Sequence, residues 1–203
     1  MIQCASVPLV LASQSTARAG LLHAAGLSFL TSPADLDETP IKAAARAAGR
    51  DAGTASLALA EAKACAVSRR RPDAMVIGAD QILVCDGQWF DKPADLAGAA
   101  SHLRALRGRT HTLATAAALA RGGEVIWRHQ EAPRLTMRAF SDAFLAAYLA
   151  AEGDAVRASV GAYRLEGLGA HLFTEVQGEH ATILGLPLLA LLAALRTEGV
   201  LTT

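Results

Sequence analysis

The hydrophobic residues of this chain fall into short unbroken runs that alternate with stretches of helical periodicity. Residues 7–12 form an apolar run of strand length, and the polar residues 13–15 follow it. A helical pattern then ends at Gly26, with Ser15 or Thr16 available as its N-cap. This stretch therefore predicts a strand, a polar turn and a helix, in that order.

The middle of the chain predicts a helix, a buried strand and a hairpin. Residues 54–69 carry apolar side chains on one helical face and basic residues at the C-terminal end. Residues 75–77 predict a buried strand that stops at residues 78–81. Beyond it, Asp86-Gly87 between two apolar runs is a strong hairpin signal.

The second half predicts helices at about residues 95–107, 141–151 and 186–196, and two long antiparallel strands at residues 110–120 and 124–138. Strands that alternate with helices around a long hairpin favour an α/β fold with a mixed central sheet and flanking helices. Neither a repeat nor a low-complexity linker divides the chain.

Composition narrows the class of protein. At 203 residues the chain suits one sizeable domain, which we expect to span residues 1–203. Basic and acidic residues number 19 each, so the basic excess of a nucleic-acid-binding protein is absent. No apolar stretch is long enough to cross a bilayer, no export signal is visible, and the three cysteines lack metal-ligand spacing. These features predict a cytoplasmic protein with reduced thiols and with neither a membrane nor a nucleic acid as partner.

Two hydroxyls and an arginine, Ser13, Ser15 and Arg18, lie between the first strand and its helix. Backbone N–H groups at a helix N-terminus favour an anion, and an arginine can clamp phosphate with two N–H groups. The alternative is an ordinary N-capped helix followed by a solvated arginine. Both interpretations stay open on this segment alone.

Asp80 follows the predicted strand at residues 75–77, at the strand end where ligands of α/β sheets gather. Its carboxylate could hold a divalent cation or accept a proton from an attacking water. A turn residue of the Asx type explains the same aspartate equally well.

Lysine is rare in this chain, with three residues among 19 basic ones. Lys63 lies on a predicted helix and Lys92 follows the hairpin. Either would suit a site that needs a compact ammonium beside a triphosphate, and either also fits an ordinary surface. Asp35, Asp37 and Glu38 form an acidic loop, which predicts a metal-binding carboxylate or merely a solvated turn.

Other common chemistries find no support in the sequence. The six histidines show no metal-ligand pattern, and His111, in a predicted strand, is interpreted as structural. Neither a P-loop nor a dinucleotide-binding glycine fingerprint is present.

Several motifs keep one order and spacing along nearly the whole chain. In that order they resemble the Maf family of nucleotide pyrophosphatases. The motifs are residues 11–18 with Leu21-Leu22, Asp37-Glu38, residues 60–64, 77–80, 91–93, 106–111 and 160–163, Glu166-Gly167, and residues 184–188.

The resemblance implies a mixed α/β fold with two lobes around a cleft, often in a homodimer. It implies hydrolysis of a nucleoside triphosphate to the monophosphate and pyrophosphate, assisted by Mg²⁺ or Mn²⁺. Carried over by position, Asp80 would be the general base and would hold the metal together with Glu38. Lys63 and Lys92 would offset charge on the triphosphate. The implied substrate-binding residues are Ser13, Ser15, Ala17, Arg18, Gln81 and Glu166.

The first loop departs from the family pattern. The family usually has Ser-x-Ser-Pro-Arg-Arg, whereas residues 13–18 read Ser-Gln-Ser-Thr-Ala-Arg, so that Ala17 replaces one arginine. Gln81 and Glu166 resemble the branch that acts on 7-methyl-GTP, which typically carries a bulky aromatic where Ala17 stands. A cationic methylated guanine would gain from stacking on such a ring. Ala17 and Gln81 therefore point to different substrates.

Three functions follow from these observations. The leading hypothesis is a house-cleaning pyrophosphatase that acts on modified or non-canonical nucleoside triphosphates. The first alternative narrows the substrate to 7-methyl-GTP, and the second is a nucleotide-binding regulator of septum formation without significant turnover. Turnover is favoured by the presence of Asp80, Lys63 and Lys92, because a regulator has to bind the nucleotide but needs no general base.

Overall fold

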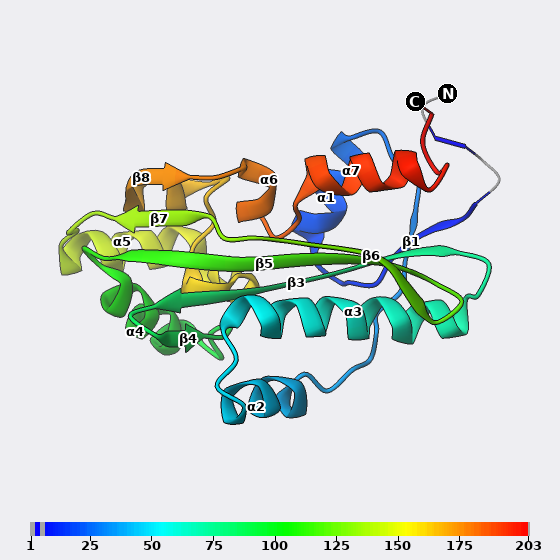
Figure 1. Ribbon diagram of the computed structural model, residues 1–203. Coiled ribbons are helices and arrows are strands. Elements are labelled where there is room, and N and C mark those ends of the chain that lie inside the picture. The colour runs from blue at the N-terminus through cyan, green and yellow to red at the C-terminus, as the bar shows by residue number, and fades with distance from the viewer. Residues whose placement is uncertain (1–2, 5–6, 203) are drawn as a thin grey trace. The chain divides into compact units, whose positions relative to one another are not determined.

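The computed structural model describes residues 3–4 and 7–202, which divide into two compact units. Unit 1 comprises Met1–Gln81, Thr115–Glu131 and Glu179–Thr203, and unit 2 comprises Ile82–Ala114 and Ala132–Gly178. The predicted α/β class is confirmed, since helices flank a mixed sheet with the strand order β2-β1-β3-β5-β7-β8, to which β4 and β6 are added (Figure 1). The predicted cleft and the single domain stay predictions.

The strands and helices follow the predicted order, with additions in the loops. The strands are β1 (Leu9–Leu11), β2 (Leu30–Thr31), β3 (Met75–Cys85), β4 (Gln88–Phe90), β5 (Thr110–Arg121), β6 (Glu124–Glu131), β7 (Arg134–Met137) and β8 (Phe173–Gln177). The α-helices are α1 (Thr16–Ala24), α2 (Thr39–Ala47), α3 (Ala52–Arg70), α4 (Leu96–Leu106), α5 (Asp142–Glu152), α6 (His180–Ile183) and α7 (Leu188–Thr197), and the 3-10 helices are η1 (Gly153–Ala158), η2 (Val160–Ala162) and η3 (Leu168–Leu172).

In unit 1, the sheet is covered by helices on both faces. Helix α3 runs along one face, and α1 and α7 lie on the other (Figure 1). The side chains of each strand alternate between these faces, because successive residues of a strand point to opposite sides. Leu9 and Leu11 of β1 pack in the core that includes α1 and α7, whereas Val10 packs in the cluster that includes Val67 of α3. The same alternation decides which way Asp80 and its neighbour in β3 point.

The predicted strand end at residues 78–81 is wrong, since β3 continues through this segment to Cys85. Gly78 was interpreted as part of a turn, but it lies where β3 and α3 approach closely. A Cβ at this position would lie 2.1 Å from the carbonyl oxygen of Ala60 and 2.8 Å from the amide nitrogen of Ala64. The glycine therefore serves close packing between strand and helix.

Elsewhere in the sheet, the predicted hairpin is confirmed and one long strand is corrected. Strands β3 and β4 pair in antiparallel fashion around Asp86 and Gly87, both of which have positive φ, as a tight two-residue turn requires. The strand predicted at residues 124–138 is two strands, β6 and β7, separated by Ala132 and Pro133. Proline has no N–H to donate to a neighbouring strand, so the ladder is interrupted there.

His111 is structural, as its position in a strand suggested. It is 1% exposed, and its Nε2 lies 2.8 Å from the hydroxyl of Tyr163. Its Nδ1 is buried without a hydrogen-bond partner among the described residues. Burial lowers the pKa of His111 to about 4, because a charged imidazole would lose its hydration. The folded chain therefore holds this ring neutral.

We expect this buried histidine to make stability depend on pH. In the unfolded chain His111 becomes protonated below about pH 6.5, whereas in the folded chain it stays neutral down to about pH 4. The free energy of unfolding should fall as pH drops through this window, by about 3 kcal/mol from this group. Urea unfolding at pH 7.5 and 4.5 would measure the loss, which should be smaller in His111→Gln. Equal losses in the two proteins would contradict the assignment.

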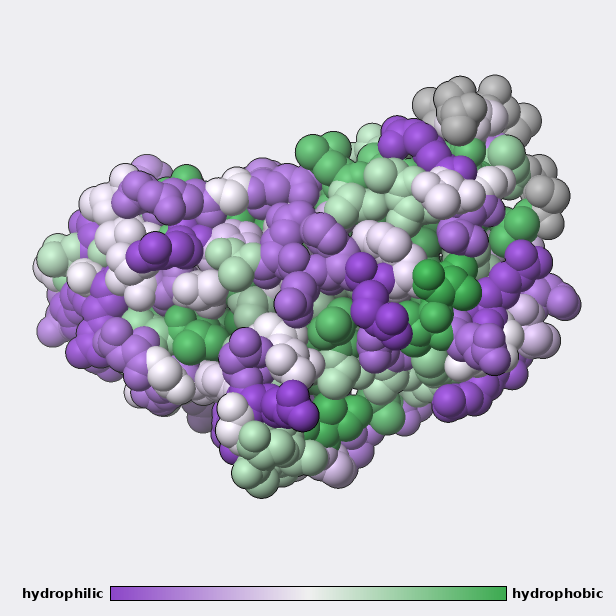
Figure 2. All heavy atoms as spheres, viewed as in Figure 1, coloured by the Kyte–Doolittle hydropathy of each residue, from purple (hydrophilic) through white to green (hydrophobic). Residues whose placement is uncertain are grey.

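The surface shows scattered apolar side chains among polar ones (Figure 2). Leu189 and Leu30 are the most exposed large hydrophobic residues described, at 68% and 54%. Single exposed residues of this kind are normal in a folded protein. Among the described residues, no helix has the length and apolar character needed to cross a membrane.

Candidate active site

A lysine between two carboxylates forms the centre of the candidate site in unit 1. Lys63 Nζ lies 2.6 Å from Oδ1 of Asp80 and 2.6 Å from Oε1 of Glu38. Lys42 adds a second ammonium group, 3.3 Å from Oε2 of Glu38. Three of the residues predicted from the sequence therefore meet in one cluster, although they come from separate parts of the chain.

Local structure explains how these three side chains meet. Lys63 lies in the fourth turn of α3, and Asp80 points to the α3 face of the sheet, two residues beyond Gly78. Glu38 is the N-cap residue of α2, a helix that the sequence analysis missed. The missed signal was Pro40, since proline is favoured in the first turn of a helix. The acidic loop is thus the start of a helix that carries Glu38 to Lys63.

The other two acidic residues of that loop have local roles. The Oδ1 atom of Asp37 accepts a hydrogen bond from the backbone N–H of Thr39 at 2.9 Å, and this bond holds the pKa of Asp37 below its ordinary value. Asp35 pairs with Arg70 at 3.4 Å on the surface. Asp35 and Asp37 therefore match the solvated turn that was one of the two interpretations of the acidic loop.

Burial and charge act against each other at Asp80, whose exposure is 6%. Desolvation raises its pKa above the ordinary value, and the positive charges of Lys63 and Arg18 only partly oppose this. At Glu38, burial also raises the pKa, but the bonds and charge of Lys63 and Lys42 outweigh it, so that the net shift is downward. The pKa values of the two carboxylates are therefore shifted in opposite directions, upward at Asp80 and downward at Glu38.

One oxygen of Asp80 has no partner within the described chain. Oδ1 accepts from Lys63, whereas Oδ2 is buried and makes no hydrogen bond. A buried carboxylate oxygen without a partner is costly, and such groups often belong to sites that bind a ligand, an ion or water.

The loop between β1 and α1 holds an arginine close to this cluster. Ser15 caps α1, as its Oγ accepts a hydrogen bond from the backbone N–H of Arg18 at 3.3 Å. The guanidinium donates through Nη1 to Oγ of Ser13 at 3.4 Å and through Nε to the carbonyl of Gly185 at 2.8 Å. Burial lowers the pKa of Arg18, although the charges of Asp80 and Glu38 oppose this shift. The side chain is half-buried, and its positive charge acts on both carboxylates.

Gln81 points to the opposite face of the sheet from Asp80. Its amide nitrogen lies 2.8 Å from Oγ1 of Thr115 and 3.1 Å from each of the carbonyl oxygens of Thr182 and Ile183. The amide nitrogen is therefore engaged by protein acceptors.

The remaining predicted residues lie elsewhere in the chain. Ala17 is half-buried in the first turn of α1, next to Arg18. Lys92 and Glu166 belong to unit 2, where both are exposed and Glu166 pairs with Arg164 at 3.3 Å. The cluster of unit 1 thus contains Ser13, Ser15, Arg18, Glu38, Lys63 and Asp80.

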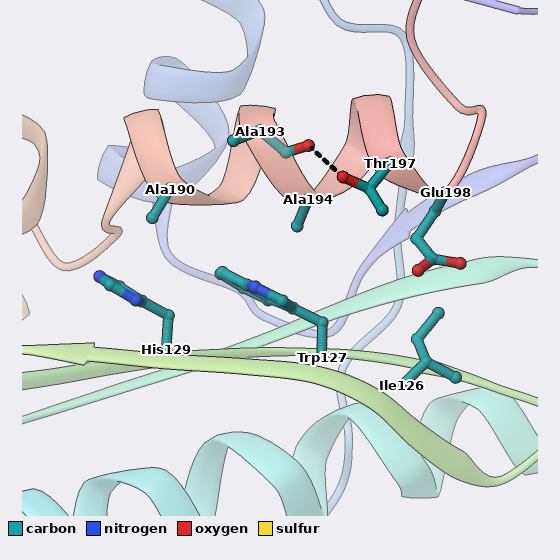
Figure 3. Close-up of a pocket in the computed structure, with 8 residues that line it drawn as sticks. All are labelled: Ile126, Trp127, His129, Ala190, Ala193, Ala194, Thr197 and Glu198. Atoms are coloured by element: carbon teal, nitrogen blue, oxygen red, sulfur yellow. Dashed lines mark hydrogen bonds between the residues drawn. The ribbon is translucent and has the colours of Figure 1, made fainter.

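A separate hollow of about 460 Å³ lies in unit 1 between β6 and α7 (Figure 3). The rings of Trp127 and His129 stack within it at an interplanar angle of 8°, opposite alanines of α7. None of the residues predicted from the sequence lines it. The hollow is therefore not the site that the motifs indicate.

The cluster has the components that an acid–base reaction on a polyanion requires. Arg18, Lys63 and Lys42 supply positive charge, and the buried carboxylate of Asp80 supplies a proton acceptor. The described residues contain no group of three or more histidine, cysteine, aspartate or glutamate side chains arranged to hold a metal. The cluster does contain two carboxylates, Asp80 and Glu38, and carboxylate oxygens are the ligands that Mg²⁺ commonly takes from a protein.

Comparison with known proteins agrees with the motifs. A family model described as "Maf-like protein" matches residues 8–198. A nucleoside triphosphate pyrophosphatase of Paramagnetospirillum magneticum is 53% identical over 94% of this chain and 98% of its own length. A protein of the same name from Granulibacter bethesdensis is 50% identical, over 96% of this chain and 98% of its own. A 7-methyl-GTP pyrophosphatase of Mesorhizobium japonicum is 48% identical, over 94% and 96% respectively.

Proposed function

The chain belongs to the family of Maf-like proteins, and on this premise we propose that it is a nucleoside triphosphate pyrophosphatase. The reaction adds water across the bridge between the α- and β-phosphates and releases the monophosphate and pyrophosphate. The observation that carries the proposal is the buried carboxylate of Asp80 beside Lys63 and Arg18. This combination supplies a base for water and cations for the phosphates.

Asp80 takes the proton of the attacking water in this proposal. Its raised pKa makes the carboxylate a stronger proton acceptor than an exposed aspartate. Lys63 keeps the side chain oriented through Oδ1, which leaves Oδ2 free of protein partners within the described residues. Oδ2 is therefore the atom that would contact water or a metal.

We propose that Asp80 and Glu38 hold a divalent cation, Mg²⁺ or Mn²⁺. The unpartnered Oδ2 and the neighbouring carboxylate fit an oxygen-preferring ion, which commonly takes its other ligands from substrate phosphates and water. Such an ion withdraws charge from phosphate oxygens and lowers the pKa of bound water.

In this proposal the phosphates bind to the loop that contains Ser13, Ser15 and Arg18. It opens α1, so the N-terminal N–H groups and the guanidinium favour an anion there. Lys92 is proposed to offset charge on the triphosphate, and the substrate-binding roles of Ala17, Gln81 and Glu166 rest on the resemblance to the family.

The preferred base is tested by a panel of substrates. Canonical, modified and 7-methylated triphosphates would be incubated with Mg²⁺ or Mn²⁺, and pyrophosphate release would be measured. The relative from Mesorhizobium japonicum makes 7-methyl-GTP a specific candidate. If no triphosphate yields more pyrophosphate with the wild type than with Asp80→Asn, the proposal fails and a nucleotide-binding regulator becomes the better reading.

Glu38→Gln should raise the metal concentration needed for half-maximal activity. The amide retains the shape of the side chain but loses the charge that attracts a divalent cation. We expect the required metal concentration to rise at least about tenfold, the lower end of the range for mutations around metal sites. Titration of Mg²⁺ and Mn²⁺ in the activity assay measures it. Asp35→Asn is the matched control: Asp35 lies in the same acidic loop as Glu38 but pairs with Arg70 of α3, so its loss should leave the titration unchanged. Equal titrations for Glu38→Gln and the wild type would remove Glu38 from the metal site.

A further inference from the structure

We propose that the turn Thr182–Gly185 is a positioning element that fixes the guanidinium of Arg18 beside Asp80, with Gly185 as its central positioning residue. The inference rests on the proposed function, for which Arg18 must face the phosphates. The turn lies far from both residues in the sequence, yet it contacts the loop of one and the strand of the other.

Gly185 contacts Arg18 in a way that another residue would disturb. Its carbonyl accepts a hydrogen bond of 2.8 Å from Nε of Arg18. Its φ is +101°, a conformation that favours glycine. A Cβ at this position would lie 3.2 Å from Nε, 3.4 Å from Nη2 and 3.7 Å from Cζ. A side chain would therefore strain the turn and press directly on the guanidinium.

The turn is itself fastened to the strand that carries Asp80. The amide nitrogen of Gln81, the next residue along β3, lies within 3.1 Å of the carbonyl oxygens of Thr182 and Ile183. Thr115 adds a hydroxyl that donates to the Thr182 carbonyl at 3.3 Å. The last carbonyls of a helix lack partners within the helix, so these side chains cap the short helix α6 and fix its end.

The guanidinium is consequently held in one plane with one nitrogen left for a ligand. Nε donates to Gly185 and Nη1 to Ser13, whereas Nη2 of Arg18 has no hydrogen bond within the described part of the chain. An arginine whose plane is already fixed loses less conformational freedom when it binds phosphate. Gln81 and Gly185 therefore both act on catalysis through Arg18 and Asp80, without a need to touch the phosphates.

A double-mutant cycle between Gly185→Ala and Arg18→Ala tests this coupling. Gly185→Ala alone should lower kcat/KM about 10- to 100-fold, the range for a misplaced binding group. In the Arg18→Ala background the same substitution should have an effect of no more than about twofold, because residues that act through one another are not additive. Additive losses would overturn the proposal.

Gly199→Ala is the matched control for backbone strain. Gly199 also follows a helix of unit 1 with positive φ, at +69°, but a Cβ there meets no atom within 4 Å. It should lower thermal stability without a change in kcat/KM. A loss of kcat/KM equal to that of Gly185→Ala would show that strain alone explains the effect and would overturn the proposal.

A measurement without turnover separates this inference from the proposed function. In NMR spectra of ¹⁵N-labelled protein, the Nε–H proton of Arg18 should exchange slowly in the wild type and faster in Gly185→Ala. Thr115→Val, a nearly isosteric change, should also speed the exchange if Gly185→Ala does not fold. Unchanged exchange in the folded variants would overturn the positioning role. Should the wild type release no pyrophosphate, slow exchange and weaker calorimetric binding of inorganic triphosphate by Gly185→Ala would still support it.

Discussion

Replacement of Asp80 by asparagine should lower kcat by at least about 100-fold, the lower range for removal of a general base. Asparagine has the same shape, and its oxygen can still accept the hydrogen bond that Lys63 donates at 2.6 Å to Asp80. What is lost is the ability to take a proton from water. Steady-state release of pyrophosphate at saturating substrate and Mg²⁺ measures the loss.

Binding and folding controls decide what an effect at Asp80 means. Asp80→Asn should stay folded, because its side-chain oxygen can still accept the bond from Lys63, whose ammonium remains paired with Glu38 at 2.6 Å. It should also bind inorganic triphosphate in calorimetry without added metal. A kcat within about tenfold of the wild type would be too small a loss for a missing general base and would refute that role.

Lys63→Met should combine the second largest loss of activity with a large loss of stability. Its ammonium bridges Asp80 and Glu38, and the side chains of Lys63 and Asp80 are only 12% and 8% exposed. Removal of one partner of a buried ion pair leaves a charge without compensation, at a cost of about 3 kcal/mol or more. We expect kcat/KM to fall about 100-fold as well, since an electrostatic contact of the triphosphate is lost. Urea unfolding at pH 7.5 and pyrophosphate release measure the two effects.

The pH profile of the same variant gives an independent test. The positive charge of Lys63 lowers the pKa of Asp80, opposing the desolvation that raises it. Loss of the lysine should therefore shift the acidic limb of kcat/KM to higher pH. Lys42→Met is the control: it removes the longer, more exposed pair with Glu38 at 3.3 Å, and it should cost no more than about 1 kcal/mol. If Lys42→Met destabilises the protein as much as Lys63→Met, the bridge at Lys63 has no special role.

Most elements of the fold could be predicted from periodicity and capping. Ser15, Asp95 and Ser141 each cap the helix that they precede, as such residues prefer to do. The errors occurred where a glycine or a proline acts through tertiary contacts or a missing donor. In the sequence Gly78 indicates a turn, but in the structure a glycine is needed there because α3 packs closely against β3. Pro133 interrupts a segment, residues 124–138, that periodicity alone joined into one strand.

The candidate site was predictable in its members more than in their arrangement. Motifs in one register singled out Asp80, Lys63 and Glu38, and these three meet. Nothing in the sequence indicated that the short helix α6 and its turn matter for the chemistry. Gly185 belongs to the motif at residues 184–188, but the sequence does not show what this motif does. Its carbonyl on Arg18 is a contact between residues separated by 167 positions.

The sequence by itself determined the class of fold and the family, and it singled out Asp80, Lys63 and Glu38 before they were seen to meet. It did so because hydrophobic period, caps and motif spacing are local properties of the chain. Only the tertiary structure decided that Lys63 bridges two carboxylates, that Asp80 and Gln81 face opposite sides of the sheet, and that Gly185 aims Arg18. These features depend on burial and on contacts between distant segments, which set the pKa of a carboxylate and the direction of a guanidinium and which no local pattern records.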